Sequence, residues 1–488
     1  MSTWKSLPGF GRESATVTLR KPHRRRLWPV VEGMEARALL SVTIQEFPTG
    51  LSSVSDPWIT EGPDGNLWFT VVTSTTTGSI ARITPAGAVT DFPITPYHGP
   101  NGGITTGSDG ALWFTELYSP SGPYGGLFLG SIGRITTTGQ VTDYPNAFNG
   151  DLAEPYAITA GPDHNVWFTE INATRVGRIT PGGQVTEFSQ GLSPLPTSTS
   201  ITPGPDGALW FVEQQTSQHP NLIGRITTSG QITEFGQGIG SGGVLQGITA
   251  GPDGALWFTM SNDTIGRITT SGQVTEFKQG ITPGSDPFSI VAGPDNALWF
   301  TEPFGDRIGR ITTSGQVTEY SAGLSPGAFP LHITNGPNGT LWFTEGGDAR
   351  VGEINVPAAP APTVEQVERF GFHLQPTTVA LTFSQPLDST SAQNVANYTI
   401  TGPGGRTIPI ASAVYDASAQ TVTLSPRSRL NLHRRYTLAV NGTPPAGVAG
   451  ASGAPLNGNG TPGTYYVTTL VGFHGQPVPV RAAHSKGR

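Results

Sequence analysis

Short runs of β-branched and aromatic residues alternate with polar turn residues through most of the chain. Around Trp257, four such runs follow one another, and each is bounded by Gly, Pro, Asp or Ser. This pattern predicts four antiparallel strands in a unit of about 45 residues. The unit recurs around seven apolar-Trp-Phe triplets, whose tryptophans are residues 68, 113, 167, 210, 257, 299 and 342. The period predicts an all-β fold, a seven-bladed β-propeller over residues 42–356.

The sequence also predicts how the ring of blades closes. The seventh unit stops at Ile354 without a fourth strand of its own. A matching strand precedes the first unit, where residues 44–47 resemble the outermost strand of the other units. We therefore expect this N-terminal strand to complete the last blade, so that no blade is left with an open edge.

Beyond the propeller the pattern changes. A Pro- and Ala-rich stretch at residues 357–363 predicts a stiff linker. Strand-like runs then recur at the spacing of a β-sandwich over residues 364–470, and the basic segment 471–488 is expected to form a loose tail. Residues 383–388 (FSQPLD) and 440–443 (VNGT) resemble bacterial immunoglobulin-like modules, which implies a spacer or an adhesive unit of a surface protein.

Composition and charge exclude several classes of protein. The abundance of Gly (66 of 488 residues) and Pro (43) excludes a long helical protein. The chain has no run of about 20 apolar residues that would predict a transmembrane helix. The absence of cysteine excludes disulfides and thiolate metal sites. The net charge is −7, although the first 41 residues are basic. The remaining body is therefore acidic, which argues against nucleic-acid binding. We expect a monomer.

The N-terminal segment 1–41 bears on localisation. Its three consecutive arginines, Arg24 to Arg26, are not followed by the apolar stretch of an ordinary secretory signal. The segment nevertheless resembles a leader found on many large planctomycete proteins that are thought to be exported. The alternative is a disordered basic arm. With the surface-type module, the leader predicts an exported, secreted or cell-surface protein.

The charges and tryptophans of the repeat have a predicted structural role. If Ser229-Gly230 is a two-residue hairpin loop, Arg225 faces Glu234, and five other blades repeat this pair. We expect these six arginines to be cross-strand partners rather than an anion-binding ring. The Gly-Pro-Asp-Gly segments are expected to be tight turns rather than calcium loops. The seven tryptophans are expected to form the blade core rather than a ligand-stacking set.

Two motifs of the repeat carry a family resemblance. Residues 251–259 (GPDGALWFT) and 265–277 (IGRITTSGQVTEF) resemble virginiamycin B lyases, the streptogramin lyase family, and the resemblance extends over all seven units. It implies a propeller that linearises streptogramin B antibiotics by metal-assisted elimination at an ester, without water. It also implies a magnesium ion on one face of the ring.

The strand order predicts where a site would lie. Each inner strand runs toward its Gly-Pro-Asp-Gly turn, so residues just before the inner-strand Ile should line the opposite mouth of the channel. Residues three positions after each Trp should lie there too. These are Val71, Glu116, Glu170, Glu213, Met260, Glu302 and Glu345. Five carboxylates at one mouth would attract a cation; the alternative is that they face solvent or neighbouring loops.

The residues that the resemblance implies for catalysis are replaced. The family places two histidines two residues before the inner-strand Ile of blades six and seven, and a metal-binding Glu two residues before the second. Here these positions hold Phe288, Leu331 and Phe329, which cannot take a proton or hold a metal. Glu345 keeps an acidic position and is a candidate metal ligand. His332 lies one residue from the expected place, which turns a strand side chain to the other face, so it is a candidate base or a packed histidine.

Three functions remain open. The first is an exported, non-catalytic propeller without a cofactor that binds a small-molecule or cell-surface ligand. The second is a magnesium-dependent lyase that linearises streptogramin B-type cyclic depsipeptides and confers antibiotic resistance. The third is a structural cell-surface protein. For the first function, the predicted ligand-binding residues at the mouth are Trp58, Glu154, Tyr156, Phe288, Phe329 and Leu331.

Overall fold

The computed structural model describes most of the chain from residue 42 to residue 477. The gaps lie at residues 52–56, 76, 120–128, 145–153, 172–174, 194–197, 215–219, 348, 358–360, 372–375, 432, 445, 451–453, 459 and 473. The predicted leader and most of the predicted tail lie outside the described residues, as does part of the predicted linker. None of the described helices has the length and apolarity needed to cross a membrane.

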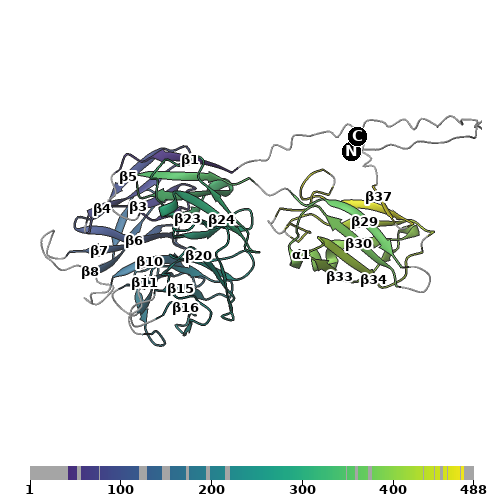
Figure 1. Cartoon of the computed structure of the whole chain (residues 1–488), viewed down its shortest axis with the longest axis horizontal. Helices are drawn as coiled ribbons and strands as arrows, with labels where there is room; N and C mark the ends of the chain where they lie inside the picture. Colours follow the sequence, from purple (N-terminus) through teal and green to yellow (C-terminus); the bar gives the residue numbers. More distant parts are fainter. Residues whose placement is uncertain are drawn as a thin grey trace, which may run out of the picture. The chain divides into compact units, whose positions relative to one another are not determined.

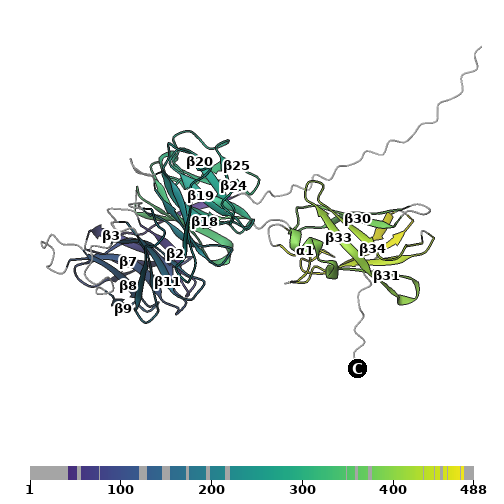
Figure 2. The same ribbon diagram turned by 90° about the horizontal axis from the view of Figure 1, so that it is seen from below.

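The propeller consists of seven four-stranded antiparallel sheets (Figures 1 and 2). In six blades, the strands follow the chain from the inner to the outer edge. The first three blades are β2 (Ile59–Glu61), β3 (Leu67–Ser74), β4 (Thr77–Ile83) and β5 (Val89–Pro93); β6 (His98–Thr106), β7 (Leu112–Tyr118), β8 (Leu129–Ile135) and β9 (Val141–Asp143); and β10 (Pro155–Ala160), β11 (Val166–Glu170), β12 (Arg175–Ile179) and β13 (Val185–Phe188).

The next three blades repeat this arrangement. They are β14 (Ile201–Pro203), β15 (Leu209–Glu213), β16 (Leu222–Ile226) and β17 (Ile232–Phe235); β18 (Leu245–Ala250), β19 (Leu256–Met260), β20 (Thr264–Ile268) and β21 (Val274–Phe277); and β22 (Ile290–Ala292), β23 (Ala297–Glu302), β24 (Arg307–Thr312) and β25 (Val317–Tyr320). Short 3₁₀ turns lie at Pro303–Gly305 and Pro337–Gly339.

Blade seven closes the ring as predicted. Its strands are β26 (Pro330–Asn335), β27 (Thr340–Glu345), β28 (Arg350–Asn355) and, from the N-terminal end, β1 (Thr43–Pro48). Strand β1 pairs antiparallel with β28, with Ile44 opposite Ile354. The seven inner strands contact one another in a closed cycle, in which β26 meets β2. The N-terminal strand therefore closes the propeller by pairing with its last blade.

The hydrophobic core is divided among the seven interfaces between blades. Each interface combines the Trp of one blade with the Leu, Phe and Ile side chains of the next, as where Trp342 of blade seven packs with Leu67 and Phe69 of blade one. All seven tryptophans of the triplets are at most 1% exposed. The prediction that they form blade core is confirmed, and each interface buries a large apolar area that holds adjacent blades together.

The hairpin between the outer strands differs from the prediction. The Thr227 N–H donates to the Gln231 carbonyl, and Gly230 has φ of +91°. The loop therefore has three residues and a glycine in the left-handed region, which is a type I turn with a bulge. The extra residue shifts the register by one position, so that Arg225 lies opposite Thr233 rather than Glu234.

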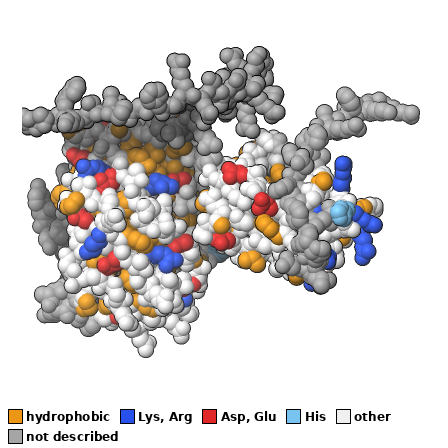
Figure 3. All heavy atoms as spheres, turned by 45° about the vertical axis from the view of Figure 1, so that its right-hand side comes forward, with side chains coloured by type: hydrophobic (Ala, Val, Ile, Leu, Met, Phe, Trp, Pro, Cys, Tyr) orange, Lys and Arg blue, Asp and Glu red, His pale blue; other side chains and the backbone are white. Residues whose placement is uncertain are grey.

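The six arginines therefore have a different partner from the one predicted. Each lies opposite its Trp in the ladder, and Arg225 Nε donates to Asp206 Oδ2 over 2.6 Å. Asp206 Oδ1 accepts the Trp210 Nε1–H over 3.0 Å. The same ion pair joins Arg82 to Asp64, Arg134 to Asp109, Arg178 to Asp163, Arg267 to Asp253 and Arg310 to Asp295. The structural role is confirmed, but the partner is the turn aspartate. Acidic and basic side chains accordingly lie side by side in Figure 3.

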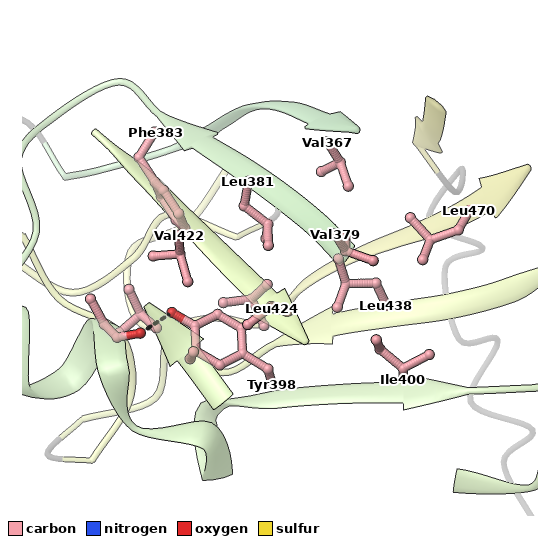
Figure 4. Packing of buried hydrophobic residues seen from close by; sticks show 14 of the residues in the cluster. Val367, Val379, Leu381, Phe383, Tyr398, Ile400, Val422, Leu424, Leu438 and Leu470 are labelled. Atoms are coloured by element: carbon pink, nitrogen blue, oxygen red, sulfur yellow. Dashed lines mark hydrogen bonds between the residues drawn. The ribbon is translucent and has the colours of Figure 1, made fainter. Parts of the chain in front are cut away.

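The C-terminal part is the predicted immunoglobulin-like β-sandwich. Its strands occur in the order β32-β31-β35-β36-β37-β29-β30-β34-β33 around one core. Figure 4 shows Val379 and Leu381 pointing toward Leu438 and Ile400 across that core. The elements are β29 (Val364–Phe370), β30 (Thr378–Phe383), α1 (Ser389–Gln393), β31 (Tyr398–Thr401), β32 (Thr407–Ile408), β33 (Ile410–Asp416), β34 (Thr421–Pro426), β35 (Tyr436–Val440), β36 (Tyr466–Val471) and β37 (His474–Pro477), with 3₁₀ turns at Val395–Asn397 and Pro403–Gly405. Strand β37 extends the domain beyond residue 470.

Candidate ligand-binding site

The mouth of the channel is built on a ring of threonines. In most blades, the second residue after Trp is a buried threonine whose hydroxyl joins two inner strands. Thr344 Oγ1 accepts from the His332 N–H over 3.2 Å and donates to the Pro57 carbonyl of the next blade over 2.6 Å. Thr301 likewise accepts from the Ser289 N–H and donates to the Leu331 carbonyl. These bonds fix the backbone just before each inner-strand Ile.

The fixed backbone presents a mostly aromatic cavity at the centre of the ring. The cavity has a volume of about 70 Å³ and is lined by Trp58, Tyr156, Thr199, Ser200, Gln246, Gly247, Phe288, Ser289 and His332. All nine residues stand one or two positions before an inner-strand Ile, as predicted for the mouth. Thr199, Ser200, Gln246 and Ser289 were not singled out in the sequence, although that positional rule includes them. Six blades with different side chains thus form one site.

His332 lies inside this cavity, contrary to the face predicted from its one-residue offset. Strand β26 has a register irregularity between Pro330 and Ile333, where Leu331 and His332 together oppose a single residue of β27. The extra residue breaks the strict alternation of faces on which the prediction depended. The His332 ring stacks on Trp58 with 3.9 Å between centroids and meets the Phe288 ring edge-on at 5.2 Å. The imidazole is therefore held between two aromatic rings.

Trp58 is the centre of the aromatic cluster. Its indole stacks on His332 and meets the Tyr156 ring edge-on at 5.8 Å. Its backbone N–H donates to Thr70 Oγ1 over 2.9 Å. Trp58, Tyr156 and Phe288 are each only partly buried, unlike the core tryptophans. The cavity thus exposes aromatic faces on which a planar or apolar ligand group can pack.

Three other predicted ligand-binding residues lie outside the described lining of the cavity. Leu331 is 8% exposed, and Phe329 lies against the exposed Phe304, with their rings edge-on at 5.2 Å. Glu154 is half-buried. Burial raises the pKa of its carboxyl above the usual value, although a hydrogen bond from Asn101 acts to lower that pKa. A part for these three residues in ligand binding stays a prediction.

The predicted ring of carboxylates at the mouth is wrong, and so is its solvent-facing alternative. All seven residues that stand three positions after a Trp are at most 3% exposed. They lie on second strands, which neighbouring blades cover on both faces. Glu345 opposes Pro330 and lines a separate, small cavity of about 20 Å³, which Arg350 also lines. The carboxylates therefore belong to the interior of the blades.

Two of these buried carboxyls are strongly perturbed. Burial raises the pKa of Glu213 to about 8, and the nearby Glu234 carboxylate adds to the effect. Burial also raises the pKa of Glu302 to about 7, with Ser285 and Arg307 acting in the opposite direction. Arg307 lies opposite Glu302 in blade six, and the equivalent position opposite Glu213 in blade four holds Leu222. The missing cation accounts for the larger shift at Glu213.

The cavity does not fit the magnesium ion that the family resemblance implies. Phe288, Phe329 and Leu331 present hydrocarbon where the family has its base and ligand positions. Among the described lining residues there is one imidazole and no carboxylate. Magnesium prefers carboxylate, phosphate and water oxygens. The retained Glu345 is in a different cavity, so it does not supply the missing oxygen ligand.

Known proteins resemble both parts of the chain. The model of the virginiamycin B lyase family matches residues 126–278 and 216–363, and that of a bacterial Ig-like domain matches residues 359–469. A structure of streptogramin B lyase is 32% identical over 65% of this chain and 98% of its own, with a TM-score of 0.55. Virginiamycin B lyase from Staphylococcus aureus is 36% identical over 65% of this chain and all of its own, with a TM-score of 0.54.

A catalytically inactive variant of the Staphylococcus aureus enzyme has been solved with quinupristin. It is 35% identical over 65% of this chain and all of its own, with a TM-score of 0.55. No curated protein matches the chain. The solved relatives cover the propeller but not the whole chain, so the Ig-like domain is an addition to the fold that they share.

Proposed function

The chain belongs to the virginiamycin B lyase family, and we propose that its propeller is a ligand-binding module without lyase activity. The observation that supports this proposal is the cavity formed by Trp58, Tyr156 and Phe288. Trp58 and Tyr156 also pack against the cores between blades, but both rings, like that of Phe288, are only partly buried and line the cavity. Such a cluster favours binding of an apolar or planar ligand group.

Elimination at an ester needs a base near the acidic proton and an electrophile at the leaving oxygen. Phe288, Phe329 and Leu331 replace the groups that the family uses for these tasks. His332 is the imidazole in the cavity, and both Trp58 and Phe288 cover it. The site therefore lacks the paired base and electrophile that the reaction requires.

The ligand class follows from the mixture of side chains. Trp58, Tyr156 and Phe288 offer ring faces, while Thr199 and Gln246 offer hydroxyl and amide groups from blades four and five. A cyclic peptide with an aromatic substituent, or a sugar ring, presents an apolar face beside hydrogen-bonding groups. We propose a ligand of this amphipathic cyclic class.

Quinupristin is a suitable first probe, because a relative has been solved with it. Titration is followed by intrinsic fluorescence, to which Trp58 contributes from within the cavity. Wild type should bind, and Trp58→Ala should weaken binding at least about 10-fold through the loss of aromatic contact. Trp4→Ala, in the N-terminal segment, is the matched control and should bind as wild type does. If neither quinupristin nor any member of a cyclic-peptide and oligosaccharide panel binds, the proposal is wrong.

A second candidate function, a lyase with a relocated base, is favoured by one observation. His332 lines the cavity, although its sequence position predicted the other face. If the chain opens the quinupristin ring and His332→Ala abolishes that turnover, the non-catalytic proposal is overturned. If the wild-type chain shows no turnover at any magnesium concentration, the relocated base is excluded.

The proposal includes export. The Ig-like domain is of a bacterial type, and the leader resemblance adds an independent argument from the sequence. The chain is expressed in a bacterial host, and the intact cells are treated with protease. An exported protein should be degraded by this treatment or be found in the medium. Full protection inside intact cells would contradict export. A purely structural surface protein would be indicated if alanine at Trp58 and Tyr156 left every cell-surface phenotype unchanged.

A further inference from the structure

A buried polar cluster in blade two differs from the equivalent position of every other blade. Outer-strand acids oppose the glycine of the third strand, as Asp143 opposes Gly133. From there the carboxylate lies near the buried Glu that stands three residues after Trp, here Glu116. The oxygen and nitrogen atoms of His98, Glu116 and Asp143 lie within 4.8 Å of one another. Two carboxylates thus share one small region of the blade interior.

Three other blades with the same pair of carboxylates place an arginine beside them. Arg175 pairs with Glu187 at 3.1 Å, Arg307 with Glu319 at 3.7 Å and Arg350 with Glu46 at 2.8 Å. In blades three and six this arginine lies directly opposite the buried Glu in the ladder. A fixed positive charge offsets the cost of burying two like charges.

Blade two lacks that arginine. Ser131 occupies the position opposite Glu116. Instead, an inner strand longer than those of the other blades brings in His98, whose Nδ1 lies 3.2 Å from Glu116 Oε2. The His98 ring is stacked on Tyr118 with 5.1 Å between centroids, which fixes its plane. The cluster therefore offers one imidazole nitrogen and two carboxylates without a permanent cation.

Two oxygens of the cluster point to an unfilled coordination site. Glu116 is fully buried, and its Oε1 has no hydrogen-bond partner among the described residues. Asp143 is only partly buried, but its Oδ1 also lacks a hydrogen-bond partner among the described residues, while its Oδ2 accepts from Thr95 Oγ1. A buried carboxylate oxygen without a donor is costly and marks a position where a ligand belongs.

We propose that His98, Glu116 and Asp143 bind a divalent transition-metal ion, with Zn²⁺ as the best fit. Imidazole nitrogen with carboxylate oxygen is a donor set of zinc, whereas magnesium and calcium prefer oxygen alone. Tetrahedral zinc bonds of about 2.0–2.2 Å place ligand atoms roughly 3.3–3.5 Å apart. The observed 3.2 Å between His98 Nδ1 and Glu116 Oε2 is close to this spacing, and an oxygen of Asp143 lies within 4.8 Å of the ligand atoms of both residues.

The ion would replace the arginine of the other blades as the charge that joins second and outer strands. This site is at the interface of strands β6 to β9 and shares no residue with the aromatic cavity, so it does not depend on the proposed ligand-binding function. The alternative to a bound metal ion is a proton on the His98 imidazole. Burial lowers the pKa of His98, but the hydrogen bond and charge of Glu116 outweigh it and raise that pKa above the usual value.

The test is zinc binding by the full chain, expressed without a histidine tag and freed of metal with a chelator. Calorimetric titration with Zn²⁺ at pH 7.5 should give one site with a Kd below about 1 µM. His98→Ala should weaken binding at least about 100-fold, because it removes one of three protein ligands. His164→Asn, on an exposed turn, is the matched control and should bind as wild type does.

Ser131→Arg separates metal binding from folding. It installs the arginine that blades three and six use, so it should abolish zinc binding while the metal-free melting temperature stays equal or rises. Zinc should raise the melting temperature of wild type but not of Ser131→Arg. If wild type binds no zinc, or if His98→Ala and Ser131→Arg bind it as wild type does, the proposal is overturned and His98 acts as a protonated partner.

Discussion

The two ends of each blade follow different rules. At the turn end, six blades repeat the same Asp–Trp–Arg arrangement, with ion-pair distances from 2.6 to 3.6 Å. At the mouth end, the two residues before the inner-strand Ile change from blade to blade. They are Pro57-Trp58, Gly102-Gly103, Tyr156-Ala157, Thr199-Ser200, Gln246-Gly247, Phe288-Ser289 and Leu331-His332.

The difference separates structural from functional demands. The turn ends meet similar neighbours, so one arrangement serves six of the seven blades, whereas in blade seven Trp342 Nε1 donates to Thr340 Oγ1. At the mouth, the threonine ring holds the backbone in most blades. The side chains there are free to differ, because the backbone does not depend on them. Variation within one ring of equivalent positions thus coincides with the surface that we propose contacts a ligand.

The largest expected effect is at the repeated end. Trp210→Ala should lower the free energy of unfolding by about 3–5 kcal/mol, because it removes a fully buried indole from the interface of blades four and five. The matched change at the mouth, Phe288→Ala, should cost less than about 1.5 kcal/mol because its ring is only partly buried. If urea unfolding gave the same loss of free energy of unfolding for both variants, the proposed difference between the two ends would be wrong.

The next effect depends on pH. Glu213 has a folded pKa of about 8, so the folded state keeps a proton that the unfolded state loses above about 4.5. Stability from this group falls as pH rises from about 4.5 to 8. Glu213→Gln should therefore raise the free energy of unfolding by roughly 2–4 kcal/mol at pH 8.5 and by little at pH 4.5. Glu302→Gln should show a smaller gain, since Arg307 lies beside it; a gain independent of pH would contradict this account.

A smaller effect is expected for one ion pair of the repeated end. Partial burial opposes ionisation of Asp206, but hydrogen bonds from Trp210 and Arg225 lower its pKa below the usual 3.8. Its stabilisation is present at neutral pH and lost as pH falls below that value. Asp206→Asn should cost about 1 kcal/mol at pH 7 and nearly nothing at pH 2.5. Thermal melts at both pH values test this.

The smallest effect on stability is expected for a polar residue of the cavity lining. Gln246→Ala removes a side chain from the cavity lining without removing the backbone bond that Gly247 donates to Thr259 Oγ1 over 2.9 Å. Its free energy of unfolding should change by less than about 0.5 kcal/mol, while affinity for the ligand found in the panel falls several-fold. A loss of stability without a loss of affinity would remove Gln246 from the site.

Much of the fold was predictable from the sequence, because blades repeat. The period of Trp257 and its counterparts gives the number of blades, and the unpaired strand at 44–47 gives the closure. The register of the outer hairpin was not predictable from the sequence. A three-residue loop with a left-handed Gly230 has nearly the same sequence signature as a two-residue loop. Because the register is shifted by one residue, Arg225 pairs with Asp206 rather than with the predicted Glu234.

The site was predictable only in part, for a related reason. The rule that residues before the inner-strand Ile line the mouth placed Trp58, Tyr156 and Phe288 in one cavity. Strand alternation failed at His332, since a bulge between Pro330 and Ile333 changes which face it takes. The cluster of His98, Glu116 and Asp143 joins three strands, and only the folded register brings its members together.

The most direct test of a mouth that binds without lyase chemistry is ring opening of quinupristin in the presence of magnesium. Elimination leaves the mass unchanged, so the linear product is identified by retention time and by tandem mass spectrometry. We predict no opening by the wild-type chain. The variant with Phe288→His, Phe329→Glu and Leu331→His restores the family's groups and is the positive comparison. Turnover by the wild-type chain at a rate above the magnesium blank would contradict the account.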